Sequence, residues 1–271
     1  MRAILGLALV AAAASCALLP AWLAPQDPNE QDLRMARKPP IWLREPPRAN
    51  LFGTDHLGRD VLSRVIYGSR VSLAVAFGSV VLGGLMGVAL GLVAGSTVSR
   101  VGDILMRLVD VQMAIPIMVM AIVLVGVLGQ SARNVVTVFA LAVYPSFARV
   151  TRGEVLQLRE REFITAAVAV GAGRPRLIVR HLVPNLLGPV LVIAMLEMAA
   201  VILYESGLGF LGLSVPPHIP SWGGMLADGR QYMTTAWWIA MFPGLAIVLT
   251  VLGLNLFSEW AHKRLAPEMR E

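Results

Sequence analysis

The chain has 271 residues, of which 56% are hydrophobic and only 15% are charged, and its formal net charge is +6. Soluble domains carry about 25% charged residues, so this composition indicates a membrane protein and makes a nucleic-acid-binding surface a poor explanation of the basic excess. With a single cysteine, Cys16, no intrachain disulfide is expected.

Six apolar stretches predict membrane-spanning helices, because about 20 helical residues at about 1.5 Å each cross about 30 Å of hydrocarbon. The first stretch is longer than the apolar region of a usual signal peptide, so we expect a retained anchor helix. The fourth is short and needs tilt or a few flanking residues. The predicted spans are residues 3–24, 72–95, 107–130, 134–150, 185–206 and 235–258.

The segment between the first two spans, residues 25–70, is rich in charged side chains. Its last part, from Asp55 to Arg70, is predicted to form an amphipathic helix that leads into the second span. Asp55 and His56 are too few ligands for a closed metal site, so we expect them to structure the loop. The apolar stripe of this helix, predicted to face the membrane, consists of Leu57, Val61, Leu62 and Val65.

Glycines and prolines within the spans predict close packing and kinks. Small residues at about four-residue spacing on one side of a helix allow a second helix to approach closely. Pro116 in the third span and Pro243 in the sixth predict kinks. The glycines of the second span that show this spacing are Gly83, Gly84, Gly87, Gly91 and Gly95.

Two carboxylates stand out inside predicted spans, where a charge near the bilayer centre costs roughly 2.5–3.5 kcal/mol. Asp110 follows Arg107 by one helical turn, so an ion pair near the inner interface competes with a cavity-facing role. Glu197 lies near the middle of the fifth span, where it either lines a pathway or pairs at an interface with another subunit. Both are candidate pathway or interface residues.

A polar loop, residues 149–184, separates the fourth and fifth spans and contains seven arginines. From Glu162 to Val170 there is no glycine or proline, so a short helix is predicted, and Gly171 ends it. Its apolar side chains follow helical spacing and form a shallow face that another protein can approach closely. A solvated basic loop is the alternative, but it leaves this face unexplained. The face consists of Phe163, Ala166, Ala167 and Val170.

The arginine-rich loop also predicts the orientation, because short loops rich in Lys and Arg stay in the cytoplasm. Six spans then put both termini inside, in agreement with Arg2 and the basic C-terminal tail. Residues 25–70 and 207–234 fall outside, although the first of these is itself rich in basic residues. Trp237 and Trp238, at the outer start of the last span, are predicted to join an interfacial aromatic belt.

The loop resembles a motif of ABC importer permeases, in which Ala-Ala is followed by Gly and later by Pro. Ala166-Ala167, Gly171 and Pro184 keep the spacing of that motif. Two further blocks resemble the peptide and nickel branch of the family, namely residues 53–64, GTDHLGRDVLSR, and residues 209–213, GFLGL. Over nearly its whole length the chain is similar to the shorter of the two permeases in such importers.

The resemblance implies an all-α, polytopic membrane protein of the bacterial cytoplasmic (inner) membrane, with six transmembrane helices in the type I ABC importer permease fold and both termini inside. We expect residues 1–71 to form an N-terminal anchor helix, an external segment and the amphipathic helix. Residues 72–271 would form a five-helix core that carries the cytoplasmic loop. No enzyme activity, catalytic residue, metal or cofactor is expected in this chain.

The resemblance also implies partners. A second homologous permease would form the other half of the pathway, and two ATPase subunits would supply energy. An external solute-binding protein would deliver peptides or related small solutes, nickel chelates included, and membrane lipid would surround the bundle. The residues to which the resemblance assigns ATPase coupling are Glu162, Phe163, Ala166, Ala167 and Gly171.

The chain carries no ATP-binding loop of the usual type, because neither Lys38 nor Lys263 follows a glycine. Energy must therefore come from partner proteins or from an ion gradient. A self-contained secondary transporter is the alternative, and it would need several ionisable residues at membrane depth and often an inverted repeat. Glu197 is the one residue recognised deep in a span, so the importer subunit is the favoured function.

Overall fold

The computed structural model describes residues 2–43, 50–96 and 100–265, and these residues form helices and loops without a β-strand. The elements in chain order are α1 (Arg2–Leu18), α2 (Pro20–Leu23), η1 (Leu33–Met35), α3 (Val61–Ser96), α4 (Arg100–Met113), α5 (Ile117–Leu128), α6 (Ala132–Arg159), α7 (Glu162–Ala169), α8 (Arg174–Leu177), η2 (Ile178–Leu182), α9 (Val183–Phe210), α10 (Trp222–Arg230) and α11 (Trp238–Leu265).

Each predicted span falls on one helix or on a pair of consecutive helices. Four helical stretches of the described residues are long and apolar enough to cross a membrane: α3, α6, the continuous run 175–210 that ends in α9, and α11. The third predicted span is the pair α4 and α5, bent by 83° at a short break, and the first is the shorter apolar helix α1. The all-helical membrane fold predicted from composition is therefore confirmed.

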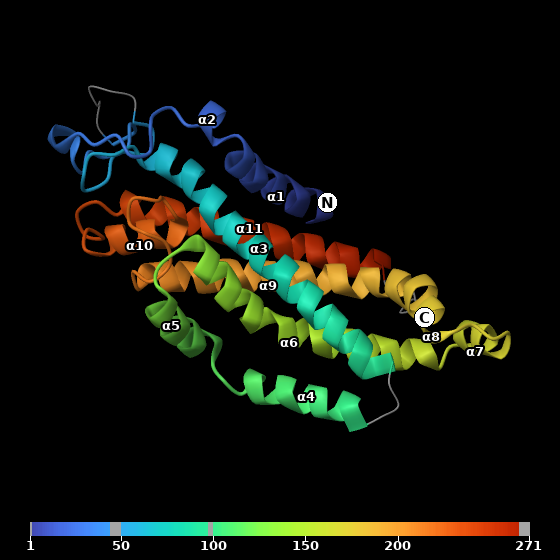
Figure 1. Cartoon of the computed structure of the whole chain (residues 1–271). Coiled ribbons are helices and arrows are strands. Elements are labelled where there is room, and N and C mark those ends of the chain that lie inside the picture. Colours follow the sequence, from blue (N-terminus) through green and yellow to red (C-terminus); the bar gives the residue numbers. More distant parts are fainter. Residues whose placement is uncertain (1, 44–49, 97–99, 266–271) are drawn as a thin grey trace.

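The glycines of the second span do allow close packing. α3 lies along α6 for most of its length (Figure 1). A Cβ atom added at Gly91 would stand 2.6 Å from the carbonyl oxygen of Ala148, and one at Gly83 would stand 2.6 Å from that of Ala140. Real Cβ atoms do not approach so closely, so the two backbones touch only because these residues lack side chains.

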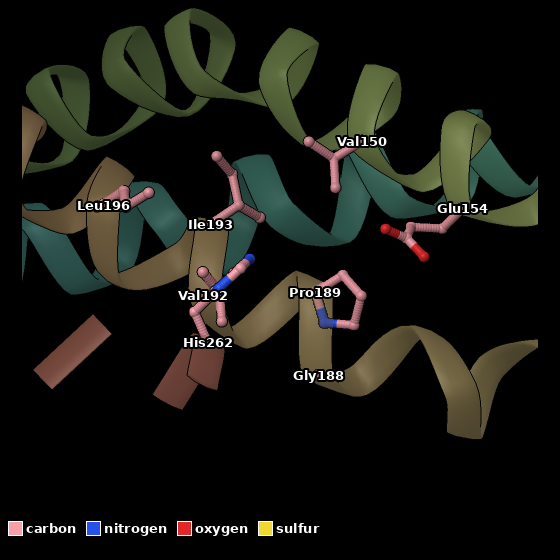
Figure 2. Close-up of a pocket in the computed structure, with 8 residues that line it drawn as sticks. All are labelled: Val150, Glu154, Gly188, Pro189, Val192, Ile193, Leu196 and His262. Carbon is pink, nitrogen blue, oxygen red and sulfur yellow. The ribbon is translucent and has the colours of Figure 1, made fainter. Parts of the chain in front are cut away.

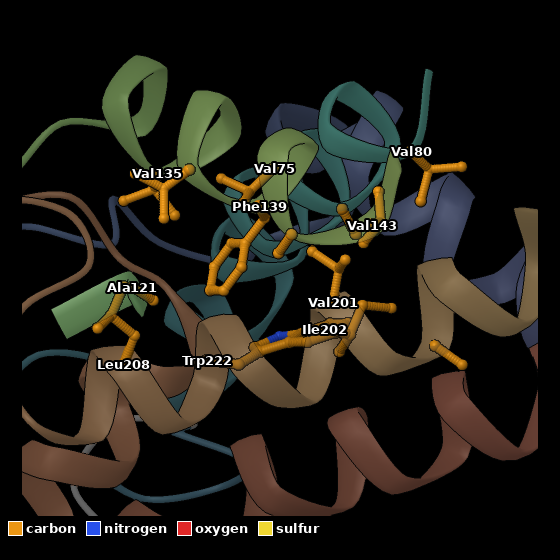
Figure 3. Packing of buried hydrophobic residues seen from close by; sticks show 14 of the residues in the cluster. Val75, Val80, Ala121, Val135, Phe139, Val143, Val201, Ile202, Leu208 and Trp222 are labelled. Atoms are coloured by element: carbon orange, nitrogen blue, oxygen red, sulfur yellow. The ribbon is translucent and has the colours of Figure 1, made fainter. Parts of the chain in front are cut away.

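A hydrophobic core joins α3, α6 and α9 and extends to α5, α10 and α11 (Figure 3). Phe139 and Phe147 of α6 are almost fully buried in it, as is Trp222 at the start of α10. Trp222 donates a hydrogen bond from Nε1 to the carbonyl oxygen of Val65, which fixes α10 against α3. The core therefore includes the outer-side helix α10 together with the long helices.

Proline has different effects in the different helices. Pro116 stands at the break between α4 and α5, so the kink predicted there is confirmed and amounts to a change of direction of 83°. Pro145, Pro189 and Pro243 lie inside α6, α9 and α11, which continue past them.

The two ends of the bundle differ in what they carry (Figure 1). The start of α1, the end of α11 and the helices α7 and α8 lie toward one end, which we call the inner end from the predicted orientation. The loops at residues 25–43 and 50–60, together with α10, lie toward the other, outer end. α1 packs on α11 where Gly6 meets Gly253, so the N-terminal helix is part of the bundle.

Two expectations for the outer end were wrong. Residues 55–60 form turns, and the helix begins only at Val61, which is fully buried against α10 and α11 instead of facing the membrane. Trp238 is 5% exposed and donates its Nε1 hydrogen to the carbonyl oxygen of Thr54, so it is a core residue and not part of an interfacial belt. Trp237 is exposed, and its place in such a belt stays a prediction. The folded outer segment covers both residues, which a span-by-span prediction does not foresee.

Candidate functional site

The predicted loop helix exists as α7, Glu162–Ala169. Glu162 stands in its first turn, where a carboxylate is favourable near the positive end of the helix dipole. The helix ends at Gly171, whose φ of +85° is a conformation that glycine adopts without strain. The amide of Ala172 donates to the carbonyl oxygen of Ala167 at 3.0 Å, which closes the helix end.

One side of α7 is anchored and the rest is exposed. Ile164 is 5% exposed and packs into a small cluster with Val155, Leu182 and Leu186, from α6, η2 and α9. The side chains predicted to form a shallow apolar face lie outside this contact. Of these, Phe163, Ala166 and Val170 are exposed and Ala167 is half-buried. Ile164, the residue that fixes α7 to the bundle, was not recognised in the sequence.

α7 is connected to the membrane helices through α8 and η2. η2, Ile178–Leu182, has the wider π-helical winding and passes directly into α9, so residues 175–210 form one continuous helical run. The ring of Phe163 lies 6.3 Å from that of His181 in η2. α7 is therefore joined to α9 by a short turn at residues 170–173 and one continuous helical run.

The two candidate carboxylates, Asp110 and Glu197, differ in their surroundings. Asp110 does not pair with Arg107 as expected, because its Oδ1 lies 2.7 Å from Nη2 of Arg149 on α6, and both side chains are more than half exposed. Glu197 is half-buried on α9 and lies near Ser146 of α6. The two carboxylates lie on different helices and are not brought together with α7.

A buried ionic cluster ties the outer segment to α10. Oδ2 of Asp55 lies 2.6 Å from Nε of Arg59 and 3.5 Å from Nε of Arg64. Oδ2 of Asp228, on α10, lies 3.3 Å and 3.4 Å from Nη2 of the same two arginines. Two guanidinium groups thus share two carboxylates, which compensates charges that would be costly to bury alone.

The same cluster bears on metal binding. Ligand atoms of Asp55, His56 and Asp228 lie within 4.8 Å of one another, so the fold adds Asp228 to the two residues considered in the sequence. Both carboxylates already pair with Arg59 and Arg64. The two arginines therefore supply the positive charge that a bound metal ion would otherwise supply. These contacts agree with the loop-structuring role that the sequence predicted.

Sequence reasoning missed one further carboxylate. Glu205, near the outer end of α9, has no exposed surface. It accepts hydrogen bonds from Ser72 of α3 at 3.0 Å and from Ser214 of the following loop at 2.8 Å. The available signal was an acidic residue next to Ser206-Gly207 within an apolar stretch. It was overlooked because it lies at the predicted end of the fifth span.

Comparison with known proteins gives concordant results. Residues 87–271 match the family model described as "Binding-protein-dependent transport system inner membrane component". The chain is 41% identical over 255 residues to the di/tripeptide transport system permease protein DppC of Pseudomonas aeruginosa strain UCBPP-PA14, covering 94% of this chain and 84% of that protein. It is 41% identical over 269 residues to the dipeptide transport system permease protein DppC of Escherichia coli K12, covering 99% and 90%.

The fold has a counterpart among solved structures. A chain of the MetNI methionine ABC transporter, in an inward-facing conformation, superposes with a TM-score of 0.63 at 16% sequence identity. The match covers 75% of this chain and 97% of that one, and at this identity it speaks for the fold alone. On its sequence and fold, the chain belongs to the family of binding-protein-dependent transport system inner membrane components, and it is a multi-pass permease of the bacterial inner membrane.

Proposed function

We propose that this permease forms half of the pathway of an ATP-driven importer for short peptides. Relatives over nearly its whole length are named as dipeptide or di/tripeptide permeases, which favours peptides over nickel chelates as the solute. A self-contained secondary transporter is disfavoured, because a binding-protein-dependent transport system works with further components. The chain itself carries out no bond chemistry, and its partners hydrolyse the ATP.

The observation that supports the coupling role is that α7 packs against the bundle on one side and is exposed on the other. Ile164 holds the helix to the bundle, while Phe163 and Ala166 offer an exposed apolar surface with a small side chain at its centre. Such a surface is complementary to a groove in another protein, since a short helix held on one side and clamped on the other transmits rigid-body motion. We assign ATPase docking to Glu162, Phe163, Ala166, Ala167 and Gly171.

The proposed assembly consists of two permeases and two ATPase subunits, served by an external binding protein. A second, homologous permease supplies the other half of the pathway, and one ATPase docks under each permease. An external solute-binding protein delivers the peptide to the outer end, where residues 207–234 are the candidate receiving surface. ATP binding draws the two copies of the coupling helix together and shifts the population between inward-open and outward-open states.

Two carboxylates are proposed to act within this assembly. We assign Glu197 to the pathway or to the interface with the second permease, since both roles need a carboxylate that is partly accessible at membrane depth. Asp110, paired with Arg149 on an exposed face of α4, fits the inner interface. We also propose residues 1–71 as an N-terminal anchor and outer segment, and residues 72–271 as the permease core.

The test of coupling is Ala166→Arg. A charge placed at the centre of the docking face should reduce ATP-dependent uptake of a labelled dipeptide in whole cells to background, with the permease still inserted. Ala132→Arg, at an exposed position near the outer end, is the matched control and should retain uptake. Full uptake by Ala166→Arg would contradict the coupling role, and uptake that persists after ATP depletion would contradict the importer.

A further inference from the structure

A pocket opens between α6, α9 and the end of α11, toward the inner end of the bundle (Figure 2). Its volume is about 220 Å³, which is below the range of about 300–1,000 Å³ that is typical for drug-sized ligands. It therefore suits a molecule about the size of a dipeptide. Most of its wall is apolar, from Val150, Pro189, Val192, Ile193 and Leu196.

The local sequence explains the shape of this pocket. Val150 and Glu154 are one helical turn apart, so both project from the same face of α6 toward α9 (Figure 2). On the opposite wall, Gly188 has no side chain and Pro189 has only its compact ring, which leaves space between the two helices. His262, near the end of α11, completes the lining.

The charges on α6 are divided between two faces. Arg149 and Arg152 each pair at 2.7 Å with an aspartate of α4, and Arg159 donates to the carbonyl oxygen of Gly95 at the end of α3. Glu154 is half-buried on the other face, among apolar side chains. Within the described part of the chain it makes no ion pair or side-chain hydrogen bond, although arginines flank it in the sequence.

We propose that this pocket is an inner binding site for the transported peptide in its zwitterionic form. The peptide's ammonium group pairs with Glu154, its carboxylate accepts a hydrogen bond from a ring nitrogen of His262, and the apolar wall contacts the side chain between them. An apolar cavity with a few convergent polar groups is the usual form of a small-molecule site. The inference rests on the proposed function and adds where the solute is held before release to the cytoplasm.

The experiment measures equilibrium binding of labelled Ala-Phe to the assembled transporter in lipid nanodiscs, without the solute-binding protein. Glu154→Gln removes the charge and keeps the shape, so it should weaken binding about tenfold or more, as expected for a lost charge-assisted hydrogen bond. Val150→Phe fills the cavity and should weaken binding as well. Glu160→Gln makes the same chemical change on an exposed residue outside the pocket and should bind like wild type.

Peptides with one blocked terminus show which end of the peptide binds Glu154 and which end binds His262. N-acetyl-Ala-Phe lacks the ammonium group, so it should bind weakly and be indifferent to Glu154→Gln. Ala-Phe-amide lacks the carboxylate, so it should be indifferent to His262→Ala. Absence of Ala-Phe binding to wild type, or equal losses in Glu154→Gln and Glu160→Gln, would overturn the proposal, while uptake in cells would report separately on the importer function.

A second copy of a permease is the competing occupant. If Val150→Phe releases the second permease during purification while Ala-Phe binding by the remaining complex is unchanged, the pocket is a subunit interface and the proposal fails. If a phospholipid co-purifies with wild type, is lost from Val150→Phe and is not displaced by Ala-Phe, the proposal fails in the same way.

Discussion

The outer and inner ends of this bundle satisfy their polar and apolar groups in opposite ways. At the outer end, the side chains of Arg59 and Asp55 are 6% and 2% exposed and bond to each other. At the inner end, Phe163 of α7 is 45% exposed, and Val170, directly after this helix, is 86% exposed. Since burying unpaired charge is unfavourable, the outer end pairs these buried charges within the chain, whereas α7 leaves apolar side chains exposed on the surface for which we propose an ATPase contact.

This difference indicates that the two ends of the permease have different roles. At the outer end, Trp222 and the ionic cluster attach α10 to the bundle. At the inner end, α7 has one buried residue, Ile164, so its stability and function should respond to different substitutions. Changes at the outer end should lower stability, and changes on the exposed face of α7 should lower uptake with the fold intact.

The largest effect on stability is expected for Arg59→Ala. It leaves the buried Asp55 and the partly exposed Asp228 short of positive charge, and breaking a buried pair costs about 3–5 kcal/mol. Thermal unfolding of the detergent-purified protein should show a clear loss of stability. An unchanged unfolding temperature would mean that the outer end is not held together by this cluster.

Glu205→Ala should have the next largest effect on stability, because it removes the hydrogen-bond acceptor of Ser72 and Ser214 at a fully buried position. Each unpaired buried group costs about 1–3 kcal/mol. Glu205→Gln keeps the shape and an acceptor oxygen, so its unfolding temperature should lie between those of wild type and Glu205→Ala. Equal losses for both variants would show that hydrogen bonding is not the reason for the burial of Glu205.

Gly171→Val should act at the inner end. A β-branched residue at a φ of +85° is strained by about 1–2 kcal/mol, while a Cβ there meets no other atom within 4 Å. We therefore expect ATP-dependent uptake to be lost while membrane insertion and unfolding temperature change little. Gly126→Val, in α5, also meets no atom within 4 Å and is the control for added bulk. Normal uptake by Gly171→Val would show that the conformation of this helix end is not needed for coupling.

The smallest effect is expected for Asp103→Ala. Its carboxylate pairs with Arg152 at 2.7 Å, but the side chain is 69% exposed. Exposed ion pairs contribute about 0–1 kcal/mol. The unfolding temperature should therefore stay near that of wild type, and a loss as large as that of Arg59→Ala would show that α4 is held mainly by charge.

The spans, the short loop helix and the close packing of α3 on α6 could be predicted from the sequence, because apolar length and small-residue spacing are local properties. The partners could not, since they come from distant parts of the chain. Asp110 pairs with Arg149 of α6, and Asp228 joins Asp55 from far along the sequence. Trp238 has the sequence context of an interfacial residue, and only the folded outer segment over it makes it a core residue.

Site-specific cross-linking tests the central claim most directly, namely that the exposed face of α7 docks an ATPase. The chain has one cysteine, so Cys16→Ser gives a background without cysteine, into which Ala166→Cys and, as a control, Ala132→Cys are introduced. Cross-linking in native membranes followed by mass spectrometry should join position 166, and not position 132, to an ATP-hydrolysing subunit. No adduct at position 166, or the same adducts at both positions, would contradict the account.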